Sequence, residues 1–317
     1  MKTFHDFDAW GDAVSGATLR LACDAVETGV WTLGLIDLGG VVLQVASEGG
    51  GNLCYGANTH ATPILFVPLT RMAEQVVNGE SLDKDSLFAI PSGADFRIRV
   101  RRRSHAWCSI SLPIEGLHPS LALSASRKIV CPPGAVARLT QIVSTIASTL
   151  LLQPGTQAAT HPATPLGTQS TGTAAHRVAG RALFEAAVRC LSAPPESRAT
   201  PIGRTRLDRA GIVRRAMAAI ESAPTIPKTT ALAEIVGVTD RTLLRTFHET
   251  YGVPPKQYLM LRELHRIRRS LRTGATADAT VADVLTLNGI WEFGRFAARY
   301  RRQFGELPSD TLRHARA

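Results

Sequence analysis

The sequence has few charged residues and no long apolar run. Charged residues make up 20% of the 317 positions and hydrophobic residues 44%. No stretch approaches the ~20 apolar residues that a membrane-spanning helix needs. The first ten residues, MKTFHDFDAW, include acids where a secretory signal has an apolar core. These absences exclude disordered and collagen-like classes and predict a soluble, cytoplasmic globular protein of about two domains.

Cysteine is scarce and scattered. The sequence has no Cys-x-x-Cys pair and no cluster of Cys and His at the spacing of metal ligands. We therefore expect reduced cysteines that serve in packing, and neither a metal nor another cofactor. The five cysteines are Cys23, Cys54, Cys108, Cys131 and Cys190.

Positive charge is abundant and unevenly distributed. The net charge is +10, and residues 205–317 hold 19 Lys and Arg against 11 Asp and Glu, a net charge of +8. Seventeen of these 19 basic residues are Arg, whose planar guanidinium suits bidentate contacts to phosphate and guanine. The distribution predicts a polyanionic partner for the C-terminal third.

Short apolar runs broken by Gly, Asn, Asp and Pro fill residues 30–112. Their spacing is typical of a barrel or a sandwich. Residues 95–100 alternate strictly, with Phe96, Ile98 and Val100 on one face, as in a half-buried antiparallel strand. The runs are VWTLGLIDLG, VVLQVAS, TPILFVPL, SLFAIPSG, DFRIRVR and HAWCSISL.

The periodicity changes after Pro132 and Pro133. Apolar residues from Val136 to Leu150 recur every three or four positions, which predicts an amphipathic helix. We expect the apolar stripe of this helix to pack either on the strands of the same chain or against a second copy of the chain. Residues 154–175 are rich in Thr, Pro, Gly and Ala and predict a flexible loop, followed by a second helix near 176–191. A Pro-rich stretch at 192–203 marks a domain boundary.

A first helix-turn-helix pattern covers residues 230–251. Thr230–Val236 forms a short helix, Gly237 supplies the turn, and Thr239 caps a second helix. Leu243 and Phe247 are four residues apart and face the core. The exposed face of the second helix then consists of Arg241, Thr242, Leu244, Arg245 and His248.

A second copy of the pattern covers residues 281–305. Val281–Asn288 is followed by a turn at Gly289 and by a helix with Phe296, Tyr300 and Phe304 on its buried side. A long helix from Pro254 to Leu271 holds the two patterns apart. Five residues lie largely on the side of this helix opposite the buried one: Gly294, Arg295, Ala298, Arg299 and Arg302.

Three segments carry a family resemblance: VGVTDRTLLRTF, YGVPPKQYLMLREL and GIWEFGRFAARYRRQFGELPSD. Residues 205–317 resemble the DNA-binding domain of the AraC/XylS family of bacterial transcription regulators. The resemblance implies an α+β protein of two domains. These would be a cupin-like β-barrel with dimerisation helices over 1–191, a linker over 192–204, and an all-α double helix-turn-helix domain over 205–317.

The resemblance also implies partners and contacts. Each recognition helix would enter one of two adjacent major-groove segments, with Arg241, Leu244 and Arg245 reading one. Gly294, Arg295 and Ala298 would read the next. Leu285 stands where the family usually has Ala, and Gly294 lacks a side chain, which favours backbone over base contacts there. Expected partners are double-stranded promoter DNA, RNA polymerase, a small-molecule effector and a second copy of the chain.

The N-terminal part resembles the family more loosely. Its strands and the turn at Pro91-Ser92-Gly93 suggest a cupin-like effector domain, but the His-x-His pattern of metal-binding cupins is absent. Trp31, His105 and Trp107 either line a ligand pocket or belong to the core, and aromatic residues in strands more often belong to the core.

The leading hypothesis is a sequence-specific transcription regulator and not an enzyme. Two alternatives stay open: a cupin-type metalloenzyme with a helical adaptor, and a non-specific nucleic-acid binder. The effector, the operator, the target genes and the direction of regulation leave no signal in the sequence.

Overall fold

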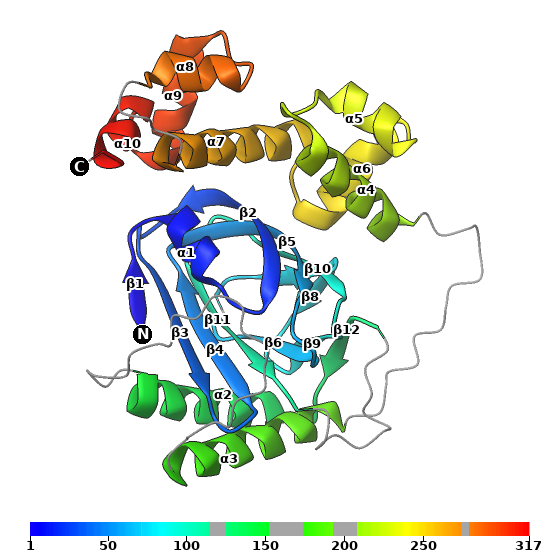
Figure 1. Ribbon diagram of the computed structural model, residues 1–317. Coiled ribbons are helices and arrows are strands. Elements are labelled where there is room, and N and C mark those ends of the chain that lie inside the picture. The colour runs from blue at the N-terminus through cyan, green and yellow to red at the C-terminus, as the bar shows by residue number, and fades with distance from the viewer. Residues whose placement is uncertain (71, 114–124, 152–173, 193–207, 274–278, 317) are drawn as a thin grey trace. The chain divides into compact units, whose positions relative to one another are not determined.

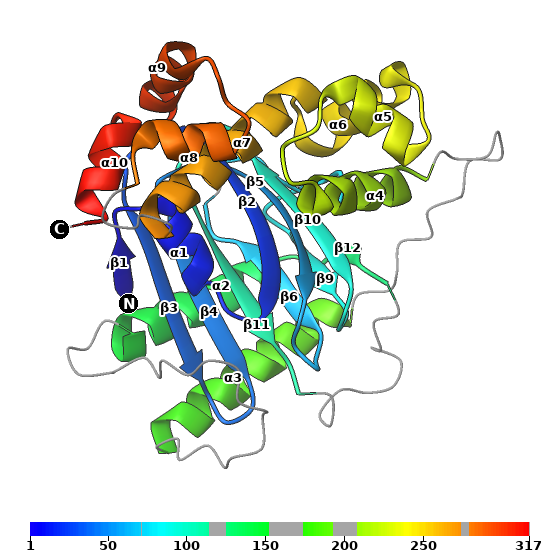
Figure 2. The ribbon, with the colours of Figure 1, turned by 45° about the horizontal axis from the view of Figure 1, so that its top comes forward.

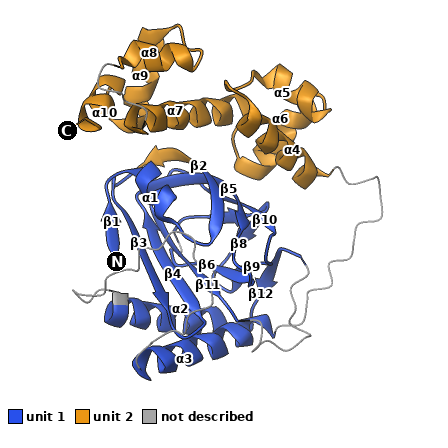
Figure 3. Ribbon diagram, viewed as in Figure 1, with its two compact units in different colours: residues 1–20, 27–199 blue, residues 21–26, 200–317 orange. Residues whose placement is uncertain are grey.

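The computed structural model describes residues 1–70, 72–113, 125–151, 174–192, 208–273 and 279–316. The chain divides into two compact units (Figure 3). The first contains residues 1–20 and 27–199, and the second contains residues 21–26 and 200–317. The expected loop at 154–175 and the expected linker at 192–204 lie almost entirely outside the described residues.

The N-terminal unit is built on two antiparallel sheets. The seven-stranded sheet has the order β1-β3-β4-β11-β6-β9-β12, and the five-stranded sheet has the order β2-β5-β10-β7-β8. The strands are β1 (Lys2–Phe4), β2 (Ala17–Val26), β3 (Trp31–Asp37), β4 (Val42–Glu48), β5 (Gly50–Asn58), β6 (Ile64–Pro68), β7 (Gln75–Val77), β8 (Glu80–Leu82), β9 (Ser86–Ile90), β10 (Asp95–Val100), β11 (His105–Ser111) and β12 (Arg127–Val130).

All six predicted strands are confirmed, as β3, β4, β6, β9, β10 and β11. The expected cupin-like barrel is not confirmed. The strands that the structure describes form two sheets and no closed barrel. Period-2 alternation specifies which face of a strand is buried. It does not specify whether the strands close on themselves, because closure depends on stagger between strands that are distant in sequence.

Two helices cover one face of the seven-stranded sheet. They are α2 (Ala135–Ile146), continued by a π-helical turn η3 (Ala147–Leu151), and α3 (Ala174–Leu191). Figures 1 and 2 show α2 and α3 side by side against the sheet. A short helix, α1 (Phe7–Ala13), precedes β2.

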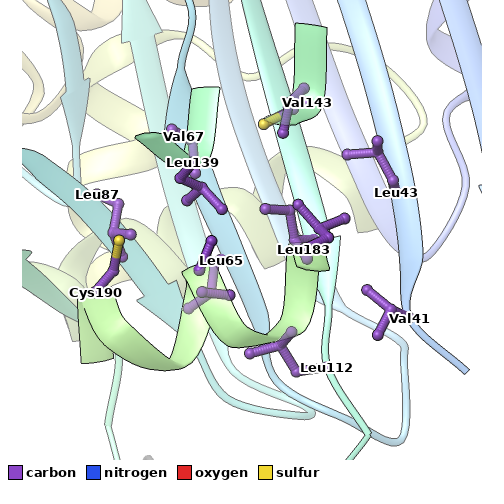
Figure 4. Close-up of a cluster of buried hydrophobic side chains, with 14 of the residues drawn as sticks. Val41, Leu43, Leu65, Val67, Leu87, Leu112, Leu139, Val143, Leu183 and Cys190 are labelled. Atoms are coloured by element: carbon purple, nitrogen blue, oxygen red, sulfur yellow. The ribbon is translucent and has the colours of Figure 1, made fainter. Parts of the chain in front are cut away.

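The main core of this unit lies between the sheet and these helices (Figure 4). Cys108 and Ile110 of β11 point into it, so His105 and Trp107 lie on the opposite face of the sheet. The apolar stripe of α2 is buried here, with Leu139 and Val143 at most 1% exposed. Of the two alternatives for this stripe, packing on its own sheet is therefore the one observed.

The second unit is mainly helical, and its residues 21–26 are the end of strand β2. Helix α7 runs through it, with α4 to α6 grouped at one end and α8 to α10 at the other (Figures 1 and 2). The helices are α4 (Arg209–Ser222), α5 (Thr229–Val236), α6 (Asp240–Tyr251), α7 (Pro255–Thr273), α8 (Val281–Leu287), α9 (Phe293–Phe304) and α10 (Pro308–His314).

Candidate DNA-binding surface

The two helical hairpins, α5–α6 and α8–α9, turn in the same way. Gly237 and Gly289 both have positive φ, +74° and +76°, a conformation that glycine adopts without a Cβ clash. Each glycine N–H donates to the carbonyl three residues back, at 3.0 and 2.9 Å. In both turns the next residue, Val238 or Ile290, donates to the carbonyl five residues back, at 3.0 and 2.9 Å. The two turn glycines predicted from sequence are confirmed.

Helix α6 buries one face and exposes the other. The Thr239 hydroxyl caps its start by accepting from the Thr242 N–H at 3.2 Å. Leu243 and Phe247 are fully buried, as predicted. The opposite face holds the predicted base-reading set, in which Arg241, Leu244, Arg245 and His248 are exposed and Thr242 is half-buried.

Helix α9 is held by a separate core. Phe296 and Tyr300 are fully buried among residues of α7, α8 and α10, and the Tyr300 and Thr311 hydroxyls are 2.8 Å apart. Helix α8 begins with a capping box, in which Thr280 and Asp283 each bond the other's backbone N–H. Each hairpin therefore has its own apolar support.

The outer face of α9 is small and basic. Gly294, Arg295, Ala298 and Arg302 are exposed, and a Cβ added to Gly294 would meet no atom within 4 Å. Arg299 differs from the others because it is half-buried. Burial raises the pKa of Glu263 on α7, and the nearby positive charge of Arg299 opposes this rise. The structure thus presents four of the five predicted α9 residues openly.

Two carboxylates that we did not single out from the sequence pair with arginines of the predicted base-reading set. Arg245 Nε lies 2.8 Å from Glu249 Oε1, and Arg209 of α4 pairs with the other oxygen of Glu249. The hydrogen bond from Arg245 and the charge of Arg209 lower the pKa of Glu249. On α9, Arg295 Nη1 lies 2.8 and 3.1 Å from the two oxygens of Glu292. Helical spacing of three and four residues is the signal that could have identified both.

Helix α7 sets the separation of the two hairpins. Its 19 residues span about 28 Å at 1.5 Å per residue, which approaches the ~34 Å of one DNA turn. Tyr258, Leu261, Leu264, His265 and Ile267 are buried, which confirms the predicted apolar side. One helix therefore contacts both hairpins, through Tyr258 at the first and through Leu264 and Ile267 at the second.

The predicted ligand residues of the N-terminal unit lie in its interior. Trp31, His105 and Trp107 are 3%, 4% and 8% exposed. Trp107 Nε1 donates to Glu48 Oε1 at 2.8 Å, and His105 Nε2 lies 3.3 Å from the same oxygen. The Trp31 ring contacts Phe7, which stacks on Trp10, and the Trp10 ring contacts Trp107.

These contacts shift the pKa of His105. Burial lowers the pKa of His105, but the Glu48 carboxylate and hydrogen bonds outweigh it, and the net shift is upward. The His105 Nδ1 atom lies 3.1 Å from the Arg103 carbonyl. Because both ring nitrogens face acceptors, the arrangement fits a protonated ring that donates from each.

No three His, Cys, Asp or Glu side chains of the described residues gather as metal ligands would. No helix among them is long and apolar enough to cross a membrane.

Comparisons with known proteins agree with this geometry. Residues 232–314 match the family model of a helix-turn-helix domain. The chain is 38% identical over 85 residues to the XylDLEGF operon transcriptional activator of Pseudomonas putida. Residues 232–314 are an AraC-type helix-turn-helix domain. The match covers 27% of this chain and 26% of the relative, so the chain spans about a quarter of the relative's length.

Other relatives match over similar lengths or at lower identity. The chain is 34% identical over 104 residues to the probable thc operon regulatory protein of Rhodococcus erythropolis, covering 32% of this chain and 31% of that protein. Among solved structures, the AraC-like transcriptional activator CuxR is 14% identical with a TM-score of 0.42, covering 89% of this chain and 96% of that one.

Proposed function

We propose that the protein is a transcription regulator that binds one DNA site through two adjacent major-groove segments. The observation that carries this proposal is the pair of helix-turn-helix hairpins on α7, each with an exposed basic face and its own core. A helix of this width fits the major groove, where each base pair presents a distinct pattern of donors and acceptors.

The exposed arginines divide into two roles in this proposal. Arg241, Arg245 and Arg295 read base edges, since a guanidinium can bond guanine O6 and N7 together. Thr242, Leu244 and His248 of α6, and Gly294 and Ala298 of α9, line the same contact surfaces. Arg301 and Arg302 neutralise phosphates and give salt-dependent affinity. Glu249 and Glu292 hold Arg245 and Arg295 in a fixed orientation before DNA arrives.

Two other arginines are less available for DNA. Arg299 is half-buried near Glu263. Arg262, a residue that could also bind phosphate, is 15% exposed and pairs with Glu221 of α4. We assign Arg299 a backbone contact and Arg262 a structural role between α4 and α7.

The rest of the proposal concerns the whole protein. The Pseudomonas putida relative is named as a transcriptional activator, and we propose activation, with RNA polymerase as a partner, in the bacterial cytoplasm. Residues 1–191 would form a cupin-like effector and dimerisation domain, joined by 192–204 to the AraC-type domain at 205–317. The protein would act as a homodimer and not as an enzyme.

An effector site, in this proposal, involves Trp31, His105 and Trp107. Glu48 Oε2, Asn52 Oδ1 and Gln75 Oε1 are buried acceptors without a hydrogen-bond partner in the described part of the chain. Asn52 and Gln75 flank Val100 on neighbouring strands. Acceptors of this kind favour an effector that donates hydrogen bonds.

Arg245→Ala tests the DNA-binding proposal. We expect specific binding to weaken by about 1–3 kcal/mol, the value of one good bidentate base contact. Binding to random-sequence DNA should change much less, because it depends on phosphate contacts. The measurement is titration of the full-length chain onto a selected site and onto a scrambled duplex at one fixed salt concentration.

Arg214→Ala is the matched control, since it removes an exposed arginine of the same unit from α4 instead of α6. It should leave the ratio of specific to non-specific affinity unchanged. Equal losses on both duplexes for Arg245→Ala would show that Arg245 contacts only phosphate.

A further inference from the structure

The two recognition helices can be compared through their buried residues. Leu243 and Phe247 of α6 are four positions apart and fully buried. Phe296 and Tyr300 of α9 have the same spacing and are also fully buried. Matching one pair to the other aligns each residue of α6 with the residue 53 positions later in α9. This register allows the exposed residues of the two helices to be compared one by one.

The positions that hold arginine on α6 hold the smallest residues on α9. In this register Arg241 corresponds to Gly294, and Arg245 corresponds to Ala298. All four residues are exposed. The two positions from which α6 presents a guanidinium therefore have no side-chain hydrogen-bond donor on α9. The two helices present different chemistry to a partner.

The fold of α9 does not require its glycine. Gly294 does not have a positive φ, and a Cβ added to it would meet no atom within 4 Å. Glycine is also a poorer helix residue than alanine. Neither backbone conformation nor packing against the described residues thus explains Gly294. Close approach of a partner to the helix backbone does explain it, because a missing side chain leaves that backbone open.

Large apolar side chains lie exposed at the start of α9. Trp291 precedes the helix and is 73% exposed, and Phe293, its first residue, is 39% exposed. Arg301 and Arg302, near the other end of the helix, are exposed as well. The outer surface of α9 is therefore apolar at its start and basic toward its end. This combination fits a polyanion that also presents apolar groups inside a groove.

We propose that α9 recognises thymine methyl groups in its major-groove segment, whereas α6 recognises guanine through its arginines. This inference rests on the proposed DNA-binding function. The C5-methyl group of thymine is an apolar feature of the major groove, and alanine and phenylalanine side chains contact it. Ala298 contacts one methyl group from the position that Arg245 has on α6. Phe293 and Trp291 cover methyl groups of neighbouring base pairs, and Gly294 lets the helix come close enough for these contacts.

The test uses the full-length chain and the duplex that it selects from random DNA. Selection repeated with Arg245→Ala identifies the segment that α6 contacts, because the sequence preference should relax there, and the other protected segment is that of α9. Deoxyuridine, which lacks only the methyl group, then replaces thymine in the α9 segment. We expect binding to weaken about fourfold for each methyl group that the contact buries.

Two variants assign this loss to α9. Trp291→Ala and Ala298→Gly should each reduce the difference in affinity between the thymine and deoxyuridine duplexes. Ile235→Ala is the matched control, since it truncates a 62% exposed apolar side chain on the first hairpin, and it should leave the difference unchanged. Because all three side chains are exposed, we expect the variants to keep the native circular dichroism spectrum.

Three results would overturn the inference while the enriched site still supports DNA binding. The α9 segment would contain no thymine, deoxyuridine in it would leave affinity unchanged, or the loss would be the same in Trp291→Ala and Ala298→Gly as in the wild-type chain. Selection without any enriched site would overturn the proposed function, and this inference with it.

Discussion

Phe247→Ala is expected to lower the free energy of unfolding of the AraC-type domain by about 3–5 kcal/mol, the usual cost of removing a buried phenyl ring. Phe247 is fully buried in α6. Its ring centroid lies 5.7 Å from that of Tyr251 and 5.5 Å from that of Tyr258 on α7. The substitution therefore removes one of the two ring contacts that join α6 to Tyr258 of α7, the other being Tyr251 at 4.7 Å. We expect specific DNA binding to weaken with it.

The measurement is unfolding by urea or heat, monitored by the far-ultraviolet circular dichroism signal of the helices. A loss of 3 kcal/mol corresponds to a fall in Tm of more than about 10 °C for a domain of this size. Leu244→Ala is the control on the same helix, because Leu244 is 44% exposed and should change stability little. A change below 1 kcal/mol for Phe247→Ala would mean that α6 is not anchored by this ring.

His105→Ala is expected to destabilise the N-terminal unit by about 3–5 kcal/mol, because it leaves the Glu48 carboxylate buried without its cation. The side chains of His105 and Glu48 are 1% and 2% exposed. Trp107 Nε1 would remain as a donor to one oxygen, while Glu48 Oε2 is already a buried atom without a hydrogen-bond partner. Unfolding of the full-length chain, followed by tryptophan fluorescence, measures the loss.

A double-mutant cycle separates the pair from general damage to the core. Glu48→Gln removes the buried charge, so the double variant Glu48→Gln, His105→Ala should be more stable than His105→Ala alone. Stability of the double variant below that of both single variants would contradict the buried ion pair. His5→Ala, at an exposed histidine, should have no effect.

The same pair predicts the sign of a pH dependence. The pKa of His105 is raised above its ordinary value of 6.5 in the folded chain. Its contribution to stability is therefore fully present below pH 6.5 and is lost as the pH rises through the folded pKa. Glu48→Gln removes the carboxylate charge, the largest of the causes that raise the pKa of His105. The loss of stability with rising pH should therefore be smaller in this variant.

Local patterns predicted the helical unit well. The spacing of Leu243 and Phe247, the turn at Gly237 and the cap at Thr239 each involve residues within about five positions, so sequence alone specifies them. The repeat at Gly289, with Phe296 and Tyr300, follows from the same rules. Where a fold depends on helix periodicity and turn chemistry, the sequence contains most of the information.

Contacts between distant segments were not predictable in this way. Cys131 and Cys190 are 59 positions apart in the sequence, yet they belong to one buried cluster. Glu48 follows a predicted strand and meets His105 only through the pairing of β4 with β11. Strand β5 escaped prediction because its glycines resemble a loop, although Gly51 and Gly56 allow close approach of neighbouring backbone.

The most direct test of the central claim is selection of binding sites from random DNA by the full-length chain, followed by footprinting on the selected sequence. The account predicts one enriched site with two protected major-groove segments about one helical turn, ~34 Å, apart on one face of the duplex. Selection without enrichment, and affinity that varies with salt but not with sequence, would contradict it and would leave the two hairpins as a non-specific nucleic-acid surface.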